Sequence, residues 1–127
     1  MCGINVIIDK KGHLTADSIQ AMNAATLYRG PDNSDFVSFQ YKGQHIFIGN
    51  NRLEIVDRNV HSNQPFHSKD KRYSLTFNGA IYNYKELKQR ISNDEWQTES
   101  DTEVLLHWMM EKGLGGLTEL NGMFAFA

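Results

Sequence analysis

The stretch Met1-Cys2-Gly3-Ile4-Asn5-Val6-Ile7-Ile8 opens the chain, and it decides how the rest of the sequence is interpreted. Its apolar residues predict a β-strand over residues 2–8 that is covered on both faces. Cys2 is the one cysteine among 127 residues. An internal disulfide and a zinc site built from several cysteines are therefore excluded.

The position of Cys2 directly after Met1 allows two interpretations. Cys2 can be a small apolar residue that happens to begin a strand. Alternatively, removal of Met1 makes Cys2 the N-terminal residue, with a thiol and a free α-amine on one residue. Because the reference pKa of an α-amine is about 7.7–8.0, this amine can accept the thiol proton near neutral pH. Such a nucleophile needs no catalytic histidine, and none of the five histidines has a Cys-His or metal-ligand spacing.

Length and charge narrow the class of protein. The length fits one domain. Thirteen Lys and Arg stand against fifteen Asp and Glu, which gives a formal charge of −2 and no single-sign field for a nucleic acid or an anionic membrane. No apolar run approaches the roughly 20 residues of a transmembrane helix, and the first residues lack the pattern of a signal peptide. We therefore expect a cytoplasmic protein, by default rather than from an address signal.

Outward from residue 8, turn residues separate short periodic segments. The pattern predicts a helix over 15–27, a hairpin over 36–41 and 45–49 with an extension over 52–57, a loop over 58–70, a strand over 72–78, helices over 84–91 and 101–110, and a strand over 123–127. The first helix is expected to carry Ile19, Met22, Ala25 and Thr26 on its apolar side. Strands and helices without regular βαβ alternation favour an α+β fold with mostly antiparallel sheets.

The apolar end of the chain, residues 123–127, resembles the beginning of a core strand. Natural domains usually end in polar, exposed residues. We therefore expect the chain to be a fragment of a longer protein. The alternative is a short last strand that ends at a buried edge.

Seven short motifs, in order from the first residue to the last, carry a family resemblance. They are Met1-Cys2-Gly3-Ile4, Arg29-Gly30-Pro31-Asp32, Arg52-Leu53-Glu54-Ile55-Val56-Asp57, Gln64-Pro65, Phe77-Asn78-Gly79-Ala80-Ile81-Tyr82-Asn83-Tyr84, Ser100-Asp101-Thr102-Glu103 and Leu120-Asn121-Gly122-Met123-Phe124-Ala125-Phe126-Ala127. Each is weak alone, but the ordered set is specific. The chain resembles the class II, N-terminal-nucleophile glutamine amidotransferase domain in its asparagine synthetase form.

The resemblance implies a fold and an activity. The fold is a four-layer αββα sandwich of mostly antiparallel sheets, and residues 1–127 would be a partial domain of this type, truncated at the C-terminus. The activity is the hydrolysis of glutamine to glutamate and ammonia by an N-terminal Cys2. L-Glutamine is the expected partner, together with a C-terminal synthetase domain of the parent chain. A homo-oligomer stays open, while nucleic acid and membrane are not expected.

The same resemblance assigns the catalytic residues Cys2, Asn78 and Gly79. The Asn78 amide and the Gly79 N–H would donate to the oxyanion, a type of contact worth about 2.7–4 kcal/mol. Arg52 would bind the substrate carboxylate and Asp101 its ammonium, with Asn78 also lining the substrate site. The same residues also have structural interpretations. Asn-Gly is a common hairpin turn, Arg52 can be a surface charge, and Asp101 can simply complement a helix dipole.

The resemblance also implies that the backbone groups of Ile55 and Val56 help to hold the substrate. Arg29 would lie near the nucleophile, and Gly30 would allow the backbone to approach it. No metal site is expected. The chain departs from the family at two positions: Ala80 replaces the usual Glu beside the glutamine site, and Asn50 replaces the usual His after Gly49.

Three functions remain open from the sequence. The first is the glutaminase part of an asparagine synthetase, with ATP and magnesium expected only in the missing synthetase domain. The second is a glutaminase that serves another acceptor, such as a sugar phosphate or a phosphoribosyl compound. The third is a non-catalytic domain that packs on a synthetase partner. In that case Ala80 would indicate loss of the glutaminase activity. The retained Cys2 and Asn78 favour an enzyme.

Overall fold

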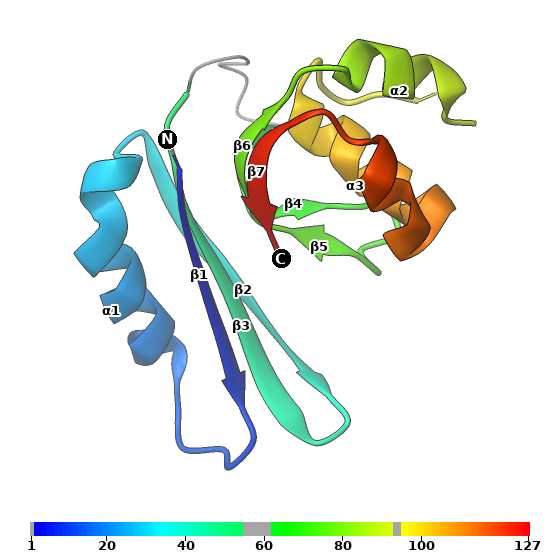
Figure 1. Ribbon diagram of the computed structural model, residues 1–127. Coiled ribbons are helices and arrows are strands. Elements are labelled where there is room, and N and C mark those ends of the chain that lie inside the picture. Colours follow the sequence, from blue (N-terminus) through cyan, green and yellow to red (C-terminus); the bar gives the residue numbers. More distant parts are fainter. Residues whose placement is uncertain (1, 55–61, 93–94) are drawn as a thin grey trace.

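A computed structural model describes residues 2–54, 62–92 and 95–127 of the chain. Figure 1 shows strands and helices in one α+β arrangement, with strands paired only antiparallel in the described ladders. The elements are β1 (Gly3–Asp9), α1 (Ala16–Thr26), η1 (Leu27–Arg29, a 3₁₀ helix), β2 (Asn33–Tyr41), β3 (Gln44–Arg52), β4 (Phe66–His67), β5 (Ser74–Leu75), β6 (Phe77–Ile81), α2 (Tyr84–Arg90), α3 (Asp101–Lys112), η3 (Gly113–Glu119, also 3₁₀) and β7 (Gly122–Phe126).

The first sheet has the order β1-β3-β2, so the middle strand comes from the predicted hairpin. Its turn uses Lys42 and Gly43, both at positive φ, which matches the twist of a tight hairpin. Helix α1 covers one face of the sheet, where Ile7, Ile19 and Phe47 form a small core. The hairpin and the antiparallel sheet are therefore confirmed.

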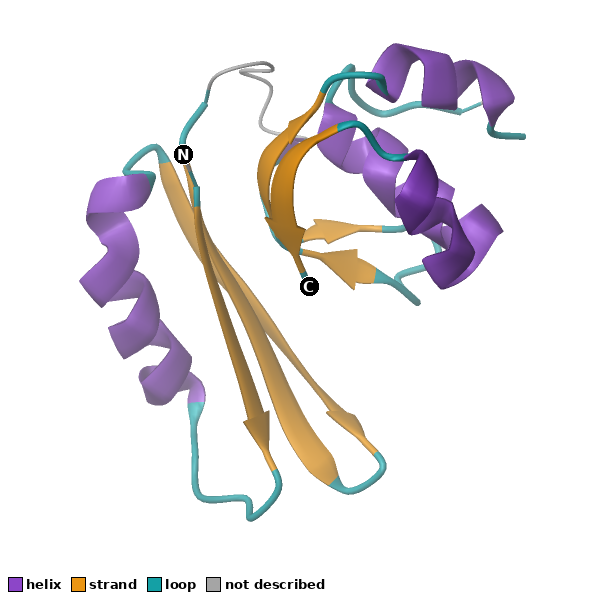
Figure 2. Ribbon diagram, viewed as in Figure 1, coloured by secondary structure: helices purple, strands orange, loops and turns teal. Residues whose placement is uncertain are grey.

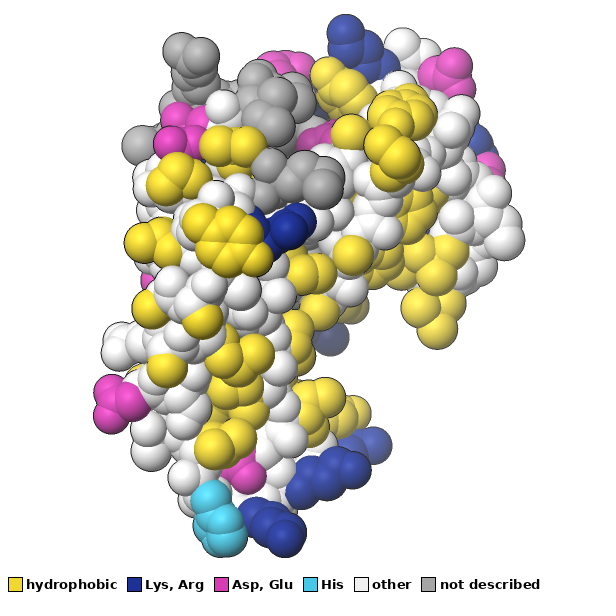
Figure 3. Space-filling view, turned by 60° about the vertical axis from the view of Figure 1, so that its left-hand side comes forward, with side chains coloured by type: hydrophobic (Ala, Val, Ile, Leu, Met, Phe, Trp, Pro, Cys, Tyr) yellow, Lys and Arg dark blue, Asp and Glu magenta, His cyan; other side chains and the backbone are white. Residues whose placement is uncertain are grey.

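The prediction that β1 is covered on both faces is wrong for this chain. The side chains of Val6 and Ile8 are 37% and 57% exposed. Successive residues of a strand point to opposite faces, and α1 covers only the face that carries Ile7. Figure 3 shows further hydrophobic side chains at the surface on the side of the molecule that carries α1.

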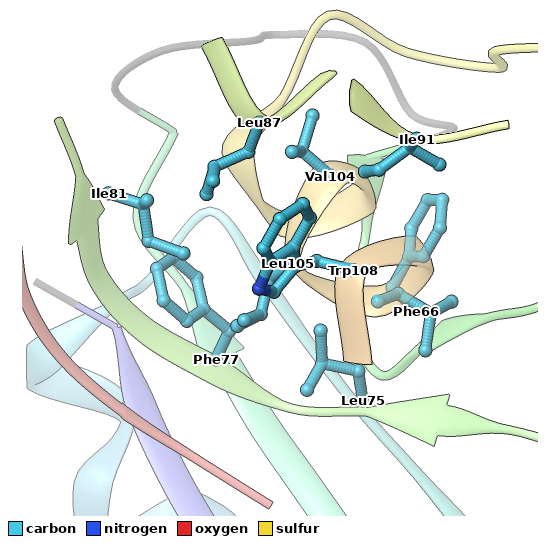
Figure 4. Close-up of a cluster of buried hydrophobic side chains, with 10 residues drawn as sticks. Phe66, Leu75, Phe77, Ile81, Leu87, Ile91, Val104, Leu105 and Trp108 are labelled. Atoms are coloured by element: carbon cyan, nitrogen blue, oxygen red, sulfur yellow. The ribbon is translucent and has the colours of Figure 1, made fainter. Parts of the chain in front are cut away.

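A second and larger core lies between the β6–β7 pair, the short β4–β5 pair and helix α3 (Figure 4). Trp108 is fully buried, and its indole N–H donates to the Gly116 carbonyl at 2.9 Å. The buried members of this core are Phe66, Leu75, Phe77, Ile81, Leu87, Ile91, Val104, Leu105, Leu106 and Trp108. This core fixes β6 against α3.

Replacing the fully buried Leu105 by alanine is expected to lower the free energy of unfolding by about 2–5 kcal/mol, because the truncation leaves a cavity in the core. Leu114, which is 78% exposed, provides a control with the same change of side chain. Its replacement by alanine is expected to change stability by less than about 0.5 kcal/mol. Urea unfolding of the two variants checks the difference, and equal losses would contradict the assignment of this core.

Several local predictions need correction. The strand expected over 72–78 is two strands, β5 and β6, and the second continues through Gly79 to Ile81. The loop expected over 58–70 contains the short strand β4 within its described part. In α1 the buried partner of Ile19 is Asn23, while Met22 and Ala25 are exposed. Asn23 is buried because it bonds polar groups of the sheet, a long-range effect that helical periodicity does not report.

The layers follow in the order α1, first sheet, β6–β7, then α2 and α3 (Figure 2). The prediction of an α+β fold is confirmed. The order of the layers is the one that the resemblance implies, but the complete αββα sandwich stays a prediction. Within the described ranges, no helix combines the length and the apolar character that crossing a membrane requires.

Candidate active site

The thiol of Cys2 lies beside the end of the middle strand. Gly3 pairs with Asn51 in the β1–β3 ladder, so Cys2 comes next to Arg52. The Leu53 N–H donates to the half-buried Cys2 Sγ at 3.4 Å, and the thiol lies 3.9 Å from the Leu53 carbonyl oxygen. Both backbone polar groups of Leu53 therefore lie near the sulfur.

The segment of Arg29 to Asp32 packs against the same two strand ends. The Arg29 Nε–H donates to the Cys2 carbonyl at 3.2 Å, which ties the backbone of the predicted nucleophile in place. A side chain on Gly30 would collide with the backbone of Asn51 and Arg52, so only glycine fits. The Asp32 N–H donates to the Arg52 carbonyl at 3.1 Å. Arg29 and Gly30 therefore lie beside the predicted nucleophile and the end of β3.

Arg52 is not a surface charge, because its exposed fraction is only 5%. Its Nη1 lies 3.3 Å from the Glu54 carboxylate and donates to the Asn63 side-chain oxygen at 2.6 Å. A buried guanidinium requires such partners, since an unpaired buried charge is very costly. The structure thus keeps a charged Arg52 next to the cysteine.

The alternation of side chains along β3 decides which way Arg52 points. The Asn51 amide donates to the Asn23 carbonyl of α1 at 2.8 Å, so Asn51 faces the helix. Asn50 and Arg52 therefore face the opposite side, toward β6. The Asn50 amide confirms this direction, because it donates to the Thr76 hydroxyl at 2.8 Å and to Gln64 Oε1 at 3.1 Å.

Strand β6 presents Asn78, its one polar side chain, to the first sheet. Phe77 and Ile81 point into the α3 core, so the residues between them with opposite orientation, Asn78 and Ala80, face β1 and β3. Gln64 Oε1 also accepts from the Phe77 N–H at 2.6 Å, which fixes the start of β6 beside β3. Strands β3 and β6 both run toward the N-terminal end of β1 (Figure 1). The Asn78 side chain therefore faces the sheet whose end carries Cys2.

Asn78 and Gly79 lie inside β6, neither in a hairpin turn nor at a strand end. Gly79 has φ +155°, and a Cβ there would collide with the Met123 carbonyl and Phe124 of the neighbouring β7. The Oδ1 of Asn78 is buried and has no hydrogen-bond partner among the described residues. A buried amide whose oxygen lacks such a partner is suited to bind an external group.

Asp101 is the first residue of α3, as expected, and is 8% exposed. Its Oδ2 accepts from the Ile81 N–H at 3.0 Å, which joins the start of the helix to β6. Burial raises the pKa of the Asp101 carboxyl above its ordinary value, although the bonds from Ile81 and from the helix N-terminus act in the opposite direction. Ionisation of this carboxylate is therefore less favourable than at an exposed helix N-terminus.

The raised pKa of Asp101 predicts a pH effect on stability. A carboxyl whose pKa is higher in the folded state stabilises the fold fully below its unfolded pKa, and this contribution is lost as the pH rises through the folded pKa. The window therefore begins near the ordinary value of 3.8 and extends upward. Asp101→Asn keeps an acceptor for Ile81 and is expected to gain stability relative to the original protein as the pH rises from 4 to 7.

Urea unfolding at several pH values checks this expectation. Asp17→Asn, at an exposed aspartate in the first turn of α1, is the control and should show no such gain. Unfolding free energies of Asp101→Asn and the original chain that run parallel from pH 4 to 7 would contradict it.

Some predicted residues lie elsewhere, and sequence reasoning missed others. Ile55 and Val56 lie outside the described residues. Ala80, which departs from the family pattern, is half-buried on β6 opposite Met123. The roles of Glu54 and Gln64 were missed, although both stand inside quoted motifs, because their partners Arg52, Asn50 and Phe77 are identified only by the fold.

Comparisons with known proteins agree with this arrangement. The family model described as a glutamine amidotransferase domain matches residues 1–127. An asparagine synthetase [glutamine-hydrolyzing] 2 of Bacillus subtilis is 36% identical over 100% of this chain and 17% of its own length. A putative asparagine synthetase of Methanocaldococcus jannaschii is 36% identical over 99% of this chain and 27% of its own length. Asparagine synthetase 1 of Arabidopsis thaliana is 31% identical over 99% of this chain and 21% of its own length.

The chain thus spans between 17% and 27% of the length of these three relatives. Their shared description does not favour the alternative acceptors or a purely non-catalytic role. The match of the family model covers every sequence motif and both strand ends that hold the cysteine. The chain belongs to the glutamine amidotransferase domain family and matches the glutaminase part of glutamine-hydrolysing asparagine synthetases.

Proposed function

We propose that this domain hydrolyses L-glutamine to glutamate and ammonia, with Cys2 as an N-terminal nucleophile. The observation that carries the proposal is the Cys2 thiol held by the Leu53 N–H at the strand end that carries the buried Arg52, with the buried Asn78 Oδ1 left without a hydrogen-bond partner. These groups supply a nucleophile, an oxyanion donor and a carboxylate-binding cation. Family membership supports the same reaction.

The reaction follows from the functional groups of Cys2. After removal of Met1, the free α-amine takes the thiol proton, and the sulfur attacks the side-chain amide carbon of glutamine. The amide oxygen becomes an oxyanion, to which Asn78 and the Gly79 N–H donate. The protonated amine passes its proton to the leaving nitrogen, so ammonia departs and a thioester remains. Water, deprotonated by the same amine, then releases glutamate and restores the thiol.

The head group of the substrate needs one cation and one anion. Arg52 can bind the α-carboxylate through its planar guanidinium. Asp101 can bind the α-ammonium once its carboxyl is ionised. Burial raises the pKa of this carboxyl, and a bound ammonium would favour its ionisation. The contribution of the Ile55 and Val56 backbone stays part of this proposal.

We further propose that the ammonia passes to an ATP-dependent synthetase domain that makes asparagine and lies in the same parent chain. The names of the relatives and the small share of their length that this chain spans support this proposal. Among the residues that the structure describes, no three His, Cys, Asp or Glu side chains gather to hold a metal ion. ATP and magnesium in the other domain, a homo-oligomer and a cytoplasmic location are further parts of the same proposal.

The test of the proposed activity is direct. The full chain is incubated with glutamine, and glutamate and ammonia are measured separately. Equal molar amounts of both products are expected, and Cys2→Ala is expected to form neither. Products that form at the same rate with Cys2→Ala would contradict the role of the cysteine, and no turnover by either protein would contradict the proposed hydrolysis.

A further inference from the structure

The edge of β6 that faces away from β7 carries backbone N–H groups whose direction the ladder determines. Thr76 and Ala127 exchange both of their backbone hydrogen bonds, at 2.9 and 3.0 Å. Phe77 comes next in the register and therefore belongs to a pair without such bonds, because the two kinds of pair alternate along an antiparallel ladder. By the same alternation, the N–H groups of Phe77, Gly79 and Ile81 all point away from β7.

Two side chains from outside β6 hold the first and the last of these three N–H groups. The Phe77 N–H donates to Gln64 Oε1 at 2.6 Å, and the Ile81 N–H donates to Asp101 Oδ2 at 3.0 Å. Gln64 and Asp101 are only 5% and 8% exposed. The Gly79 N–H lies between these two bonds, and it is the backbone group that the proposed reaction assigns to the oxyanion. Buried acceptors therefore hold the strand on both sides of that donor.

Gln64 also joins β6 to the first sheet. The Asn50 amide of β3 donates to the same Gln64 Oε1 at 3.1 Å, and to the Thr76 hydroxyl at 2.8 Å. One side-chain oxygen thus accepts from β3 and from the backbone of β6. Arg52 lies two residues beyond Asn50 on the same face of β3, at the strand end that carries the thiol. The placement of β6 against this strand end therefore depends on the Gln64 amide.

The geometry of an oxyanion donor tolerates little displacement. Such a donor acts at about 2.7–3.1 Å from the oxygen that becomes charged. Without the oxygen of Gln64, two buried donors, the Phe77 N–H and the Asn50 amide, would lose their acceptor. The start of β6 could then satisfy them only by moving, and a displacement of about 1 Å in a catalytic site can lower the rate about 100-fold.

We propose that Gln64 is a positioning residue of the glutaminase reaction, whose side-chain oxygen fixes the open edge of β6 so that the Gly79 N–H and the Asn78 amide are aimed at the oxyanion. This inference rests on the proposed function, because it concerns the same reaction. Gln64 acts through β6 and not through a contact with the substrate. Its loss should therefore lower kcat and leave KM nearly unchanged.

Steady-state glutaminase kinetics of the full chain that begins at Cys2 test the proposal. Gln64→Met keeps nearly the length of the side chain and removes the acceptor oxygen. We expect kcat to fall about 10- to 100-fold and KM to stay within about threefold of the original value. Gln64→Glu keeps an oxygen that can accept both bonds, and it is expected to bring kcat back to within about threefold of the original protein.

Two variants serve as controls. Thr76→Val removes a hydroxyl from the same buried cluster but leaves the bond between Phe77 and Gln64, and Gln89→Met makes the matched change on the exposed face of α2. Both are expected to keep kcat within about threefold of the original, because neither changes the edge of β6. Urea unfolding shows whether each variant is folded under assay conditions. If Gln64→Met is not folded, Gln64→Asn replaces it, since its amide is one bond of about 1.5 Å shorter.

The outcomes separate positioning from a general effect on the fold. A loss of kcat in Gln64→Met that Gln64→Glu restores, and that both controls lack, supports the inference. An equal loss in Thr76→Val would overturn it, because any damage to the buried cluster would then slow the reaction. An unchanged kcat in the folded variant, a loss confined to KM, or a Gln64→Glu variant as slow as Gln64→Met would also overturn it. No turnover by the original chain would instead contradict the proposed function, on which the inference depends.

Discussion

Protein that carries any residue before Cys2 is expected to hydrolyse glutamine at least about 100-fold more slowly than protein that begins at Cys2, the lower range for loss of a general base. A preceding residue converts the α-amine into a peptide amide, which cannot accept the thiol proton. The thiol, with a reference pKa near 8.5, is then only a few per cent thiolate at neutral pH.

A removable N-terminal extension tests this prediction on one preparation. Glutamine turnover is measured before and after a protease cleaves the extension directly in front of Cys2. The same treatment of Cys2→Ala controls for effects of the protease. Equal turnover before and after cleavage would contradict the N-terminal nucleophile and would require another base for the thiol.

Asn78→Ala is expected to lower kcat for glutamine by about 100- to 1,000-fold, because the side chain is the proposed donor to the oxyanion. The KM should change much less, since the contact strengthens mainly in the transition state. The variant should keep its stability, because no described residue donates to the buried Asn78 Oδ1 and truncation therefore breaks no bond there.

Steady-state kinetics and urea unfolding of the same sample check both parts of this prediction. A loss confined to KM would place Asn78 in ground-state binding only. A kcat that stays within threefold of the original protein, in a folded variant, would remove Asn78 from the proposed oxyanion site.

Local sequence patterns were sufficient for the elements that carry strong signals. The hairpin of β2 and β3 follows from alternation around Lys42 and Gly43, and α3 follows from the cap at Ser100, whose hydroxyl accepts from the Glu103 N–H. Each of these signals depends on residues that are close together in the sequence, so it can be recognised without knowledge of the fold.

Long-range contacts explain the errors. Asn-Gly at 78 and 79 is a turn sequence by local preference, but pairing with β7 holds it inside a strand. In the same way, Asn23 is buried in α1 because it bonds Asn5 and the Asp35 carbonyl of two different strands. Ile8 on β1 is the opposite case. Its apolar side chain predicts burial, but the side chain is exposed in this chain.

The residues of the candidate site could be predicted from the sequence, but their arrangement in space could not. The ordered motifs predicted Cys2, Arg52 and Asn78, and strand alternation turns Arg52 and Asn78 toward the space between the two layers. The ion pair of Arg52 with Glu54 depended on the path of the chain after β3, which no local pattern specifies.

The central claim is that Cys2 is the nucleophile of a glutamine site. The most direct measurement is intact mass spectrometry of protein that begins at Cys2, after treatment with a glutamine analogue that carries an electrophilic carbon in place of the side-chain amide. The account predicts one covalent adduct, located on Cys2 by peptide mapping and prevented by an excess of glutamine. An adduct on another residue, or labelling of Cys2 that glutamine does not prevent, would contradict it.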